Sequence, residues 1–499
     1  MIFRAAKEAL MKTHRRGWLV LSAVIISTLS PVMRADELAE AEKQIKGHEL
    51  YDLCKVMASR EFSGRLSGHA GYTKAAQWAA GKFKEWGLRP LDSKAGYLQA
   101  YPSPASVLES AELSVDLSAA APGQGTVATR LKAELVRDFL PLVFSDSGQL
   151  QGTAAVFCGW GISAPEIGYD DYAGIDARDK FVFCFRGTPD PKDRRYQVHD
   201  EHRSRMQTAK NKGAKGIVYI YEELQINPNG DVIPGFTPLM ISEAFADQLL
   251  NADHFTCAQL KKDLLAYKRP LSFPLLARFD YRVKSRLDAA GVGYNVAAWV
   301  EGSHPELRRE VVVLGAHFDA CGEHLGLLFP GANDNGSGSS VVMGAAKASA
   351  TLERKPKRSL LFVLFGGEEK GLQGSTWFAG HLPASFNKVA AMFNFDMEGE
   401  GDRAGAAISA VPATLKDAIL RADEDSKTLA ATRVMNPPGV RGSDFAPFFN
   451  QGIPCASFWS NGPHIEYHTI GDTIYRINPD ILADIARLAF RAAYLCADL

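Results

Sequence analysis

The sequence contains few cysteines, and none of them have the spacing of a structural zinc site. Its seven cysteines among 499 residues include no C-x-x-C pair. They are too scattered for the disulfide framework of a small secreted domain. Neither charge sign dominates, because 56 Lys and Arg residues stand against 57 Asp and Glu residues, for a net charge of −1. The sequence therefore has no global basic field, and we expect no nucleic-acid partner.

Long apolar runs are absent after the first 33 residues, and we find no internal repeat or low-complexity tract. The exception is the charge-free run 17–33, whose apolar centre at 18–29 follows a cluster of basic residues. A basic segment before a short apolar one is typical of a secretory signal peptide, whereas a membrane span needs roughly 20 apolar residues. We predict a cleaved signal at 1–35 and an exported protein, periplasmic or secreted, without stable membrane insertion. A retained signal would instead anchor the protein.

The chain length and a change in the pattern of apolar runs along the sequence predict more than one folded unit. The length exceeds what one compact core usually holds, and 46% hydrophobic with 23% charged residues is ordinary globular composition. Between 142 and 274, short apolar runs alternate with charged, Gly- and Pro-rich turns. We predict a smaller β-rich unit there, inserted between two parts of a larger domain at 36–141 and 275–499.

The larger domain has nearly continuous apolar runs, as strands buried on both faces should have. The amphipathic segments 72–86 and 481–495 are predicted as helices. We therefore expect an α/β fold of three layers, α/β/α, with a mostly parallel sheet. The predicted strands are 311–316, 360–365, 390–395 and 455–458.

Histidines and carboxylates follow these apolar strands, where a hydrophobic core would not place them. In open α/β sheets, sites form outside the carboxyl ends of the strands, so residues far apart in sequence can converge. The candidate residues, in chain order, are His317, Asp319, Asp334, Glu368, Glu369, Asp396, Tyr467 and His468.

Two histidines and three carboxylates suit a pair of zinc-class divalent ions with one bridging carboxylate. Such a pair can polarise a carbonyl and activate water near neutral pH. Glu369 can bind a metal while its neighbour Glu368 takes the proton of the attacking water. Asp319, two residues after His317, is placed to orient that imidazole. Each motif alone is weak, because adjacent glutamates are usually solvated and Asp334 lies in a turn-like Asn-Asp-Asn-Gly.

Taken together, the segments AHFDACGE, PGANDNGSG, FVLFGGEEKGLQGS, FNFDM, GSDFAPF and YHTIGDT resemble the M28 family of zinc peptidases. That family includes bacterial aminopeptidases and the glutamate carboxypeptidase branch. The stretch that begins FSGRLSGH resembles the family's amino-terminal segment, and GWGISAPEIGYDDYAGIDARDKFVFCFRG resembles a protease-associated (PA) domain. The resemblance implies a zinc peptidase domain that carries a PA-like insertion at 142–274.

The resemblance also implies two Zn²⁺ ions and a set of five metal ligands. His317 and Asp396 would hold one ion, Glu369 and His468 would hold the other, and Asp334 would bridge them.

Three further roles follow from the resemblance. Glu368 corresponds to the general base, Asp319 to the aspartate that supports a ligand, and Tyr467 to a tyrosine that holds the oxyanion in some members. A cis peptide bond is implied at Asp334-Asn335. The implied substrate is a peptide or an aminoacyl compound.

Some residues depart from the family pattern. Phe445 stands where many relatives have His, which concerns substrate contacts and no metal ligand. Cys321 lies four residues after His317, but the family pattern needs no thiolate, so we expect no role for it. The acidic run 398–402 is either a solvated loop or a site that recognises a cationic amine near the metals.

The leading hypothesis is an exported dinuclear zinc aminopeptidase. A glutamate-carboxypeptidase-like enzyme is the second reading, although that branch has a long helical domain after the peptidase core and few residues follow His468 here. A glutaminyl cyclase would use one zinc, which the full set of five ligands disfavours. A catalytically inactive binding protein on the same fold would be marked by lost ligands, and none is lost. The PA-like segment is either a lid over the site or a binding module.

Overall fold

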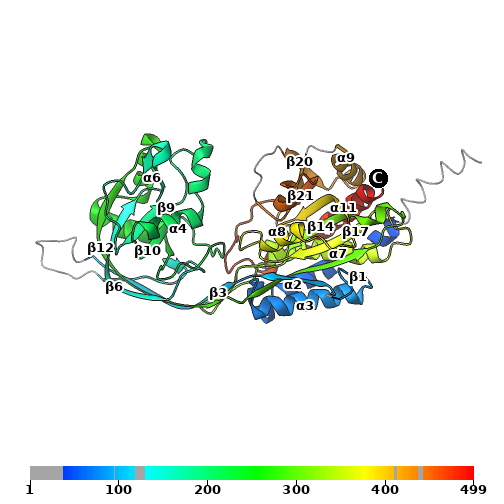
Figure 1. Ribbon diagram of the computed structural model, residues 1–499, viewed down its shortest axis with the longest axis horizontal. Coiled ribbons are helices and arrows are strands. Elements are labelled where there is room, and N and C mark those ends of the chain that lie inside the picture. Colours follow the sequence, from blue (N-terminus) through cyan, green and yellow to red (C-terminus); the bar gives the residue numbers. More distant parts are fainter. Residues whose placement is uncertain (1–37, 95, 118–129, 410–412, 436–441) are drawn as a thin grey trace, which may run out of the picture.

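The computed structural model describes residues 38–94, 96–117, 130–409, 413–435 and 442–499. The predicted signal peptide therefore lies outside the described residues. Figure 1 shows two units side by side, joined by long strands. The larger unit is built on a nine-stranded sheet and the smaller one on an eight-stranded sheet.

The sheet of the larger unit has a parallel centre. Strands β17 (Ser359–Phe365), β14 (Glu310–His317), β18 (Lys388–Phe395) and β21 (Cys455–Asn461) lie next to one another in this order and run in parallel. These are the four strands predicted from the apolar runs. Antiparallel pairings flank the centre, through β13 (Val292–Val300) on one side and β19 (Arg403–Ser409) on the other. The outer strands are β1 (Arg89–Pro90), β2 (Leu98–Pro102) and β20 (Leu429–Met435).

Helices cover both faces of this sheet because successive side chains of its strands point to opposite faces. In β14, Val312 and Leu314 pack into one hydrophobic cluster, whereas Val311 and Val313 pack into another. The first cluster includes α2 (Gly47–Met57), α3 (Ala70–Glu85), α7 (Gly338–Ala350), α9 (Ala413–Asp423) and α11 (Pro479–Ala497). The second includes α8 (Gln373–Gly380) and α10 (Phe445–Phe449). The larger unit is thus the expected three-layer α/β/α domain, and α3 and α11 are the two predicted helices.

The smaller unit is also layered, with helices on both faces of a mixed sheet. Strands β6 (Gly148–Cys158), β9 (Phe181–Phe185), β10 (Gly216–Tyr221) and β11 (Leu239–Ser242) are parallel neighbours. One face packs on α4 (His202–Asn211), and the other packs on α5 (Glu243–Leu250) and α6 (Cys257–Tyr267). The short strands β4 (Arg130–Lys132) and β5 (Phe139–Pro141) end the sheet.

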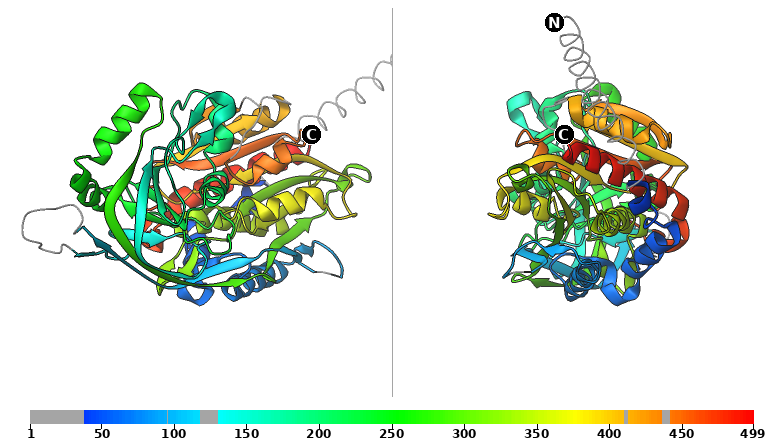
Figure 2. Two further views of the ribbon diagram at one scale, coloured as in Figure 1. Left: turned by 60° about the vertical axis from the view of Figure 1, so that its left-hand side comes forward. Right: turned by 90° about the vertical axis from the view of Figure 1, so that its right-hand side faces the viewer.

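The smaller unit extends beyond the range 142–274 that the sequence indicated. Its sheet includes β3 (Ala105–Asp116) and β12 (Ser272–Asp288), which form a long antiparallel pair. This pair runs out of the larger unit into the smaller one, as Figures 1 and 2 show. The connection is therefore a two-stranded ribbon, and the sheet takes in strands on both sides of the predicted insertion.

Two small hairpin-like sheets complete the described chain, β7 (Ser163–Ala164) with β8 (Tyr169–Asp170), and β15 (Gly322–His324) with β16 (Leu327–Phe329). Within the described ranges, we find no helix with the length and apolar character needed to cross a bilayer. His317 ends β14, whereas Glu369, Asp396 and His468 follow β17, β18 and β21 along the chain.

Candidate metal centre

The first half of the candidate site lies at the ends of two neighbouring parallel strands. His317 ends β14 and Asp396 follows β18, so the strand pairing brings them together. Nε2 of His317 lies 3.4 Å from Oδ1 of Asp396 and 3.1 Å from Oδ1 of Asp334. Asp334 belongs to the turn Ala332–Ser337, which immediately precedes α7. Three predicted ligands therefore meet at one point.

The second half lies beside it and shares Asp334. Nε2 of His468 is 2.9 Å from Oε2 of Glu369 and 3.3 Å from Oδ2 of Asp334. Asp334 thus presents one carboxylate oxygen to each histidine. The structure brings all five predicted metal ligands together, and the peptide bond Asp334-Asn335 is cis, as the resemblance implied.

Burial and charge act against each other in this site. Burial alone would lower the pKa of His317, but Asp396 and Asp334 raise that pKa well above its ordinary value. The pKa of His468 is likewise raised well above its ordinary value, against the effect of burial, by a group of neighbours that includes Cys321 and Glu369. Burial would raise the pKa of Asp334, yet the two histidines lower it. The buried carboxylates therefore favour a positive charge beside them, either on the histidines or on a bound cation.

The donor atoms fit divalent metal ions. Oε1 of Glu369 and Nε2 of His468 are buried without a hydrogen-bond partner among the described residues. Buried polar atoms are rarely left in that state unless an ion or water satisfies them. Imidazole nitrogen and carboxylate oxygen are ligands that zinc takes, and a cation would neutralise the excess of carboxylates.

Asp319 supports this site mainly through the backbone. Its carboxylate accepts hydrogen bonds from the backbone N–H groups of Glu368 at 3.1 Å and Glu369 at 3.3 Å. The sequence predicted that it orients His317, but its Oδ1 lies 3.8 Å from Nδ1 of that imidazole. The backbone carbonyl of Asp319 is closer to Nδ1, at 3.3 Å. Asp319 therefore links the end of β14 to the Glu368-Glu369 turn.

A cavity of about 1080 Å³ opens next to the ligands. The larger unit lines it with Glu368, Glu369, Tyr467 and His468, and the ring of Tyr467 stacks on that of His468 with centroids 3.8 Å apart. The smaller unit contributes Arg186, His202, Arg203, Asn227 and Asn229. The inserted unit is therefore a wall of the cavity into which the candidate base Glu368 faces.

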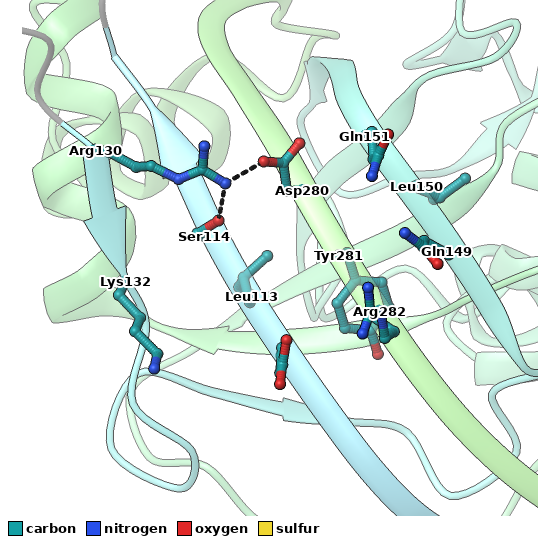
Figure 3. Close-up of a pocket in the computed structure, with 11 residues that line it drawn as sticks. Leu113, Ser114, Arg130, Lys132, Gln149, Leu150, Gln151, Asp280, Tyr281 and Arg282 are labelled. Atoms are coloured by element: carbon teal, nitrogen blue, oxygen red, sulfur yellow. Dashed lines mark hydrogen bonds and ion pairs between the residues drawn. The ribbon is translucent and has the colours of Figure 1, made fainter.

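Another cavity, of about 440 Å³, lies on the smaller unit and contains none of the predicted site residues. Figure 3 shows that residues of β3, β4, β6 and β12 line it. There Arg130 donates a hydrogen bond to Oγ of Ser114 at 2.9 Å and pairs with Asp280. The two groups of potential metal ligands that occur among the described residues both lie beside the larger cavity instead.

Three supporting residues were missed from the sequence. Arg65 is fully buried and donates hydrogen bonds to the carbonyls of Phe318 at 2.9 Å and Gly331 at 2.8 Å. Ser443 donates one to Oδ2 of Asp396 at 2.7 Å. Asp472 accepts hydrogen bonds from the backbone N–H groups of the Asp334 turn, at 2.7 and 3.0 Å.

The signal for these three residues was present in the sequence. Each lies within a segment that resembles the family, namely FSGRLSGH, GSDFAPF or YHTIGDT. The sequence alone does not indicate which groups Arg65, Ser443 and Asp472 contact.

The acidic run 398–402 is not fully solvated, because the side chains of its two glutamates are buried. Glu398 is completely buried, and its carboxylate accepts a hydrogen bond from the backbone N–H of Asp396. Glu400 is also buried and pairs with Arg476 at 3.0 Å. Neither glutamate lines the cavity, so Glu398 supports the ligand Asp396 instead. Phe445 packs into the core beside α8.

The inserted unit also contacts the second half of the site through the backbone. The N–H of Ile226 donates a hydrogen bond of 3.0 Å to the carbonyl of His468. His468 has φ of 57°, in the left-handed region that is uncommon for residues other than glycine. The side chain of Ile226 is buried against Val143, Cys321 and Phe329. The loop that carries His468 is thus held from outside the peptidase sheet.

Comparison with known proteins agrees with this geometry. Residues 295–493 match the family model "Peptidase family M28". Over 202 residues the chain is 32% identical to leupeptin-inactivating enzyme 1 of Streptomyces exfoliatus, which covers 38% of this chain and 43% of that protein. Over 200 residues it is 30% identical to aminopeptidase YwaD of Bacillus subtilis, covering 38% of this chain and 41% of that protein. The matches thus span less than half the length of these curated relatives.

The fold is shared over both units. The solved structure of BSAP, a zinc aminopeptidase from Bacillus subtilis, superimposes with a TM-score of 0.60 at 20% identity. That match covers 90% of this chain and 94% of the other. The segment 295–493 that matches the family model contains all five converging ligands and the strands that position them. Residues 295–493, which form most of the larger unit, are thus similar to peptidase family M28.

Proposed function

We propose that this protein is an exported aminopeptidase that uses two zinc ions to hydrolyse amino-terminal peptide bonds. The observation that carries the proposal is the position of Asp334, whose two oxygens face His317 and His468 respectively. A carboxylate in that position suits two ions held side by side. The similarity to an aminopeptidase in sequence and to a zinc aminopeptidase in fold supports the same activity.

His317, Asp396 and Asp334 would hold one ion, and Glu369, His468 and Asp334 the other. Two zinc ions bound there would polarise the scissile carbonyl and lower the pKa of the attacking water. The remaining steps belong to the chain itself, and they begin with the proton of that water.

Glu368 is the group that accepts this proton. It lines the cavity, and burial raises the pKa of its carboxyl well above the ordinary value, which favours uptake of a proton. Asp319 fixes its position through the backbone N–H of Glu368. Tyr467, on the same cavity wall, would donate a hydrogen bond to the oxyanion. Glu368 can then return its proton to the leaving amine.

A specific observation keeps the carboxypeptidase-like alternative open. Nε and Nη1 of Arg186 are buried without a hydrogen-bond partner among the described residues, and this side chain lines the cavity. A guanidinium group in that state suits a substrate carboxylate. A carboxypeptidase-like enzyme would bind the carboxy-terminal carboxylate of its substrate at this position.

Three matched peptides test the polarity of cleavage. The first has free ends, the second is acetylated at its amino terminus, and the third is amidated at its carboxy terminus. An aminopeptidase cleaves the first and third and releases the amino-terminal residue, whereas acetylation abolishes turnover. Equal cleavage of the free and acetylated peptides would reject the proposal, and release of carboxy-terminal residues from the acetylated peptide would favour the alternative.

Export is tested separately. If residues 1–35 are a signal peptide, amino-terminal sequencing of the protein recovered from outside the cytoplasm should begin near Asp36. A mature chain that retains residues 18–29 would mean an anchored enzyme.

A further inference from the structure

Cys321 lies in the second half of the metal centre, although the family pattern needs no thiolate there. It follows the end of β14 and is only 3% exposed. One ligand atom each from Cys321, Glu369 and His468 lie within 4.8 Å of one another. Zinc bonds of about 2.0 to 2.3 Å place the ligands of a tetrahedral ion roughly 3.3 to 3.8 Å apart. The three groups thus need only a small contraction to share an ion.

The partners of Cys321 provide an independent indication of a ligand at this point. Oε1 of Glu369 and Nε2 of His468 are buried and lack hydrogen-bond partners among the described residues. Cys321 itself packs against a cluster of apolar side chains that includes Ile226 from the inserted unit. This packing fixes the backbone that carries the thiol. The thiol of Cys321 thus lies within 4.8 Å of ligand atoms of both Glu369 and His468.

We propose that the thiolate of Cys321 is an additional ligand of the metal ion held by Glu369 and His468. The inference rests on the proposed two-ion centre and makes its two halves chemically different. One half would offer sulfur, nitrogen and oxygen, whereas the half of His317 and Asp396 offers only nitrogen and oxygen. On coordination the thiol loses its proton to solvent, and no oxidant or reductant is needed.

The added ligand changes what each ion can do. With Asp334, Glu369, His468 and Cys321, the second ion has four protein ligands, which is the pattern of structural zinc sites. The first ion has three, which leaves a position for water or substrate, as in catalytic sites. Sulfur also favours zinc and softer ions over manganese or magnesium. The second ion should therefore be the tighter one and the more selective for soft metals.

X-ray absorption of the full-length wild-type protein loaded with two zinc ions tests the assignment without any substitution. It should show sulfur at about 2.3 Å, with one sulfur for every two zinc ions. Cobalt loading should add a sulfur-to-cobalt charge-transfer band in the near ultraviolet. The Cys321→Ser variant should lose both signals. Cys257→Ser, which removes a buried thiol of the inserted unit, is the matched control and should keep both.

Each outcome decides the proposal. Two zinc ions with no sulfur in the wild type would overturn the thiolate assignment and leave the proposed function intact. Sulfur that persists in a folded Cys321→Ser variant would overturn it as well. A wild-type chain that holds no zinc would refute the two-ion centre and this inference together. If Cys321→Ser fails to fold, as circular dichroism would show, the wild-type sulfur signal decides the outcome alone.

Discussion

The two halves of the metal centre are built on different kinds of backbone. His317 and Asp396 lie at the ends of adjacent parallel strands whose pairing sets their distance. Glu369 and His468 lie on loops, and the loop of His468 is held by a hydrogen bond from Ile226 of the inserted unit. The first half is positioned within the larger unit, mainly by the pairing of two strands, whereas the second also depends on a contact between the two units. Loss of the inserted unit should therefore damage one half before the other.

The largest expected effect separates catalysis from metal binding at two adjacent residues. Glu368→Gln should keep both ions and lower kcat at least ~10²-fold, the lower range for a positioned general base. KM should change little, because the lost interaction belongs to the transition state. Single-turnover kinetics with metal analysis measures both effects.

Glu369→Gln is the matched control for that experiment. It should lose the second ion, and added zinc should restore part of its activity. If instead Glu368→Gln loses metal while Glu369→Gln keeps both ions, the two roles are reversed.

A second experiment asks whether the halves are separable. Asp396→Asn should lower the zinc affinity of the first half by more than ~10-fold, since even the mutation of a residue that only supports a metal ligand lowers metal affinity that much. The half with Glu369 and His468 should retain its ion. Stepwise zinc titration monitored by mass spectrometry reports each ion separately. Simultaneous loss of both ions would show that the halves form one unit.

A third prediction concerns pH. The raised pKa values of His317 and His468 mean that the metal-free site holds protons that zinc must displace. Zinc affinity should therefore fall as pH falls, by about tenfold per pH unit for each proton released. For the metal-free fold the sign is opposite. Protonated histidines stabilise it below their unfolded pKa, and this contribution is lost as pH rises through the raised values.

Calorimetry of zinc binding in two buffers of different ionisation enthalpy counts the released protons. Proton release from both halves fits the raised pKa values. Zinc affinity that does not change with pH would contradict them.

The smallest effect tests the contact between the units. Ile226→Pro removes the N–H that bonds to the carbonyl of His468, and a net hydrogen bond is worth about 0.5 to 1.5 kcal/mol. Zinc affinity of the second half should drop by about 2- to 10-fold, with the first half unchanged. Ile226→Ala keeps the N–H and shortens only the side chain, so it separates the hydrogen bond from the packing. An equal loss of zinc affinity in both halves would show that the contact with the inserted unit does not act on the second half alone.

The same comparison shows what the sequence could reveal. The runs 311–316 and 390–395 are nearly continuous apolar runs because helices cover both faces of their strands, so the strand ends could be located. Polar residues at those ends then identified His317 and Asp396. These two candidate ligands are thus predictable from the residue pattern, whereas their assignment to one ion follows from the family resemblance.

The geometry of the second half is harder to predict from the sequence. The residue pattern includes His468 among the candidate ligands, but its pairing with Glu369 follows only from the family resemblance. Its position depends on a left-handed backbone conformation and on a contact with Ile226, far away in the sequence. The family pattern needs no thiolate, so it predicts no role for Cys321, whereas the structure places Cys321 beside Glu369 and His468. The sheet of the smaller unit also includes strands outside the range 142–274 that the sequence predicts for the insertion. Strands β3 and β12 pair over most of their length across sequence that had been assigned to the larger domain.

Zinc titration of the metal-depleted full-length chain tests the central claim most directly. Native mass spectrometry would count bound ions while release of the amino-terminal residue from an unblocked peptide is followed in the same samples. The account predicts two zinc ions per chain, and full turnover only after both have bound. Full activity with one ion, activity without any metal, or no zinc retained by the five converging ligands would contradict it.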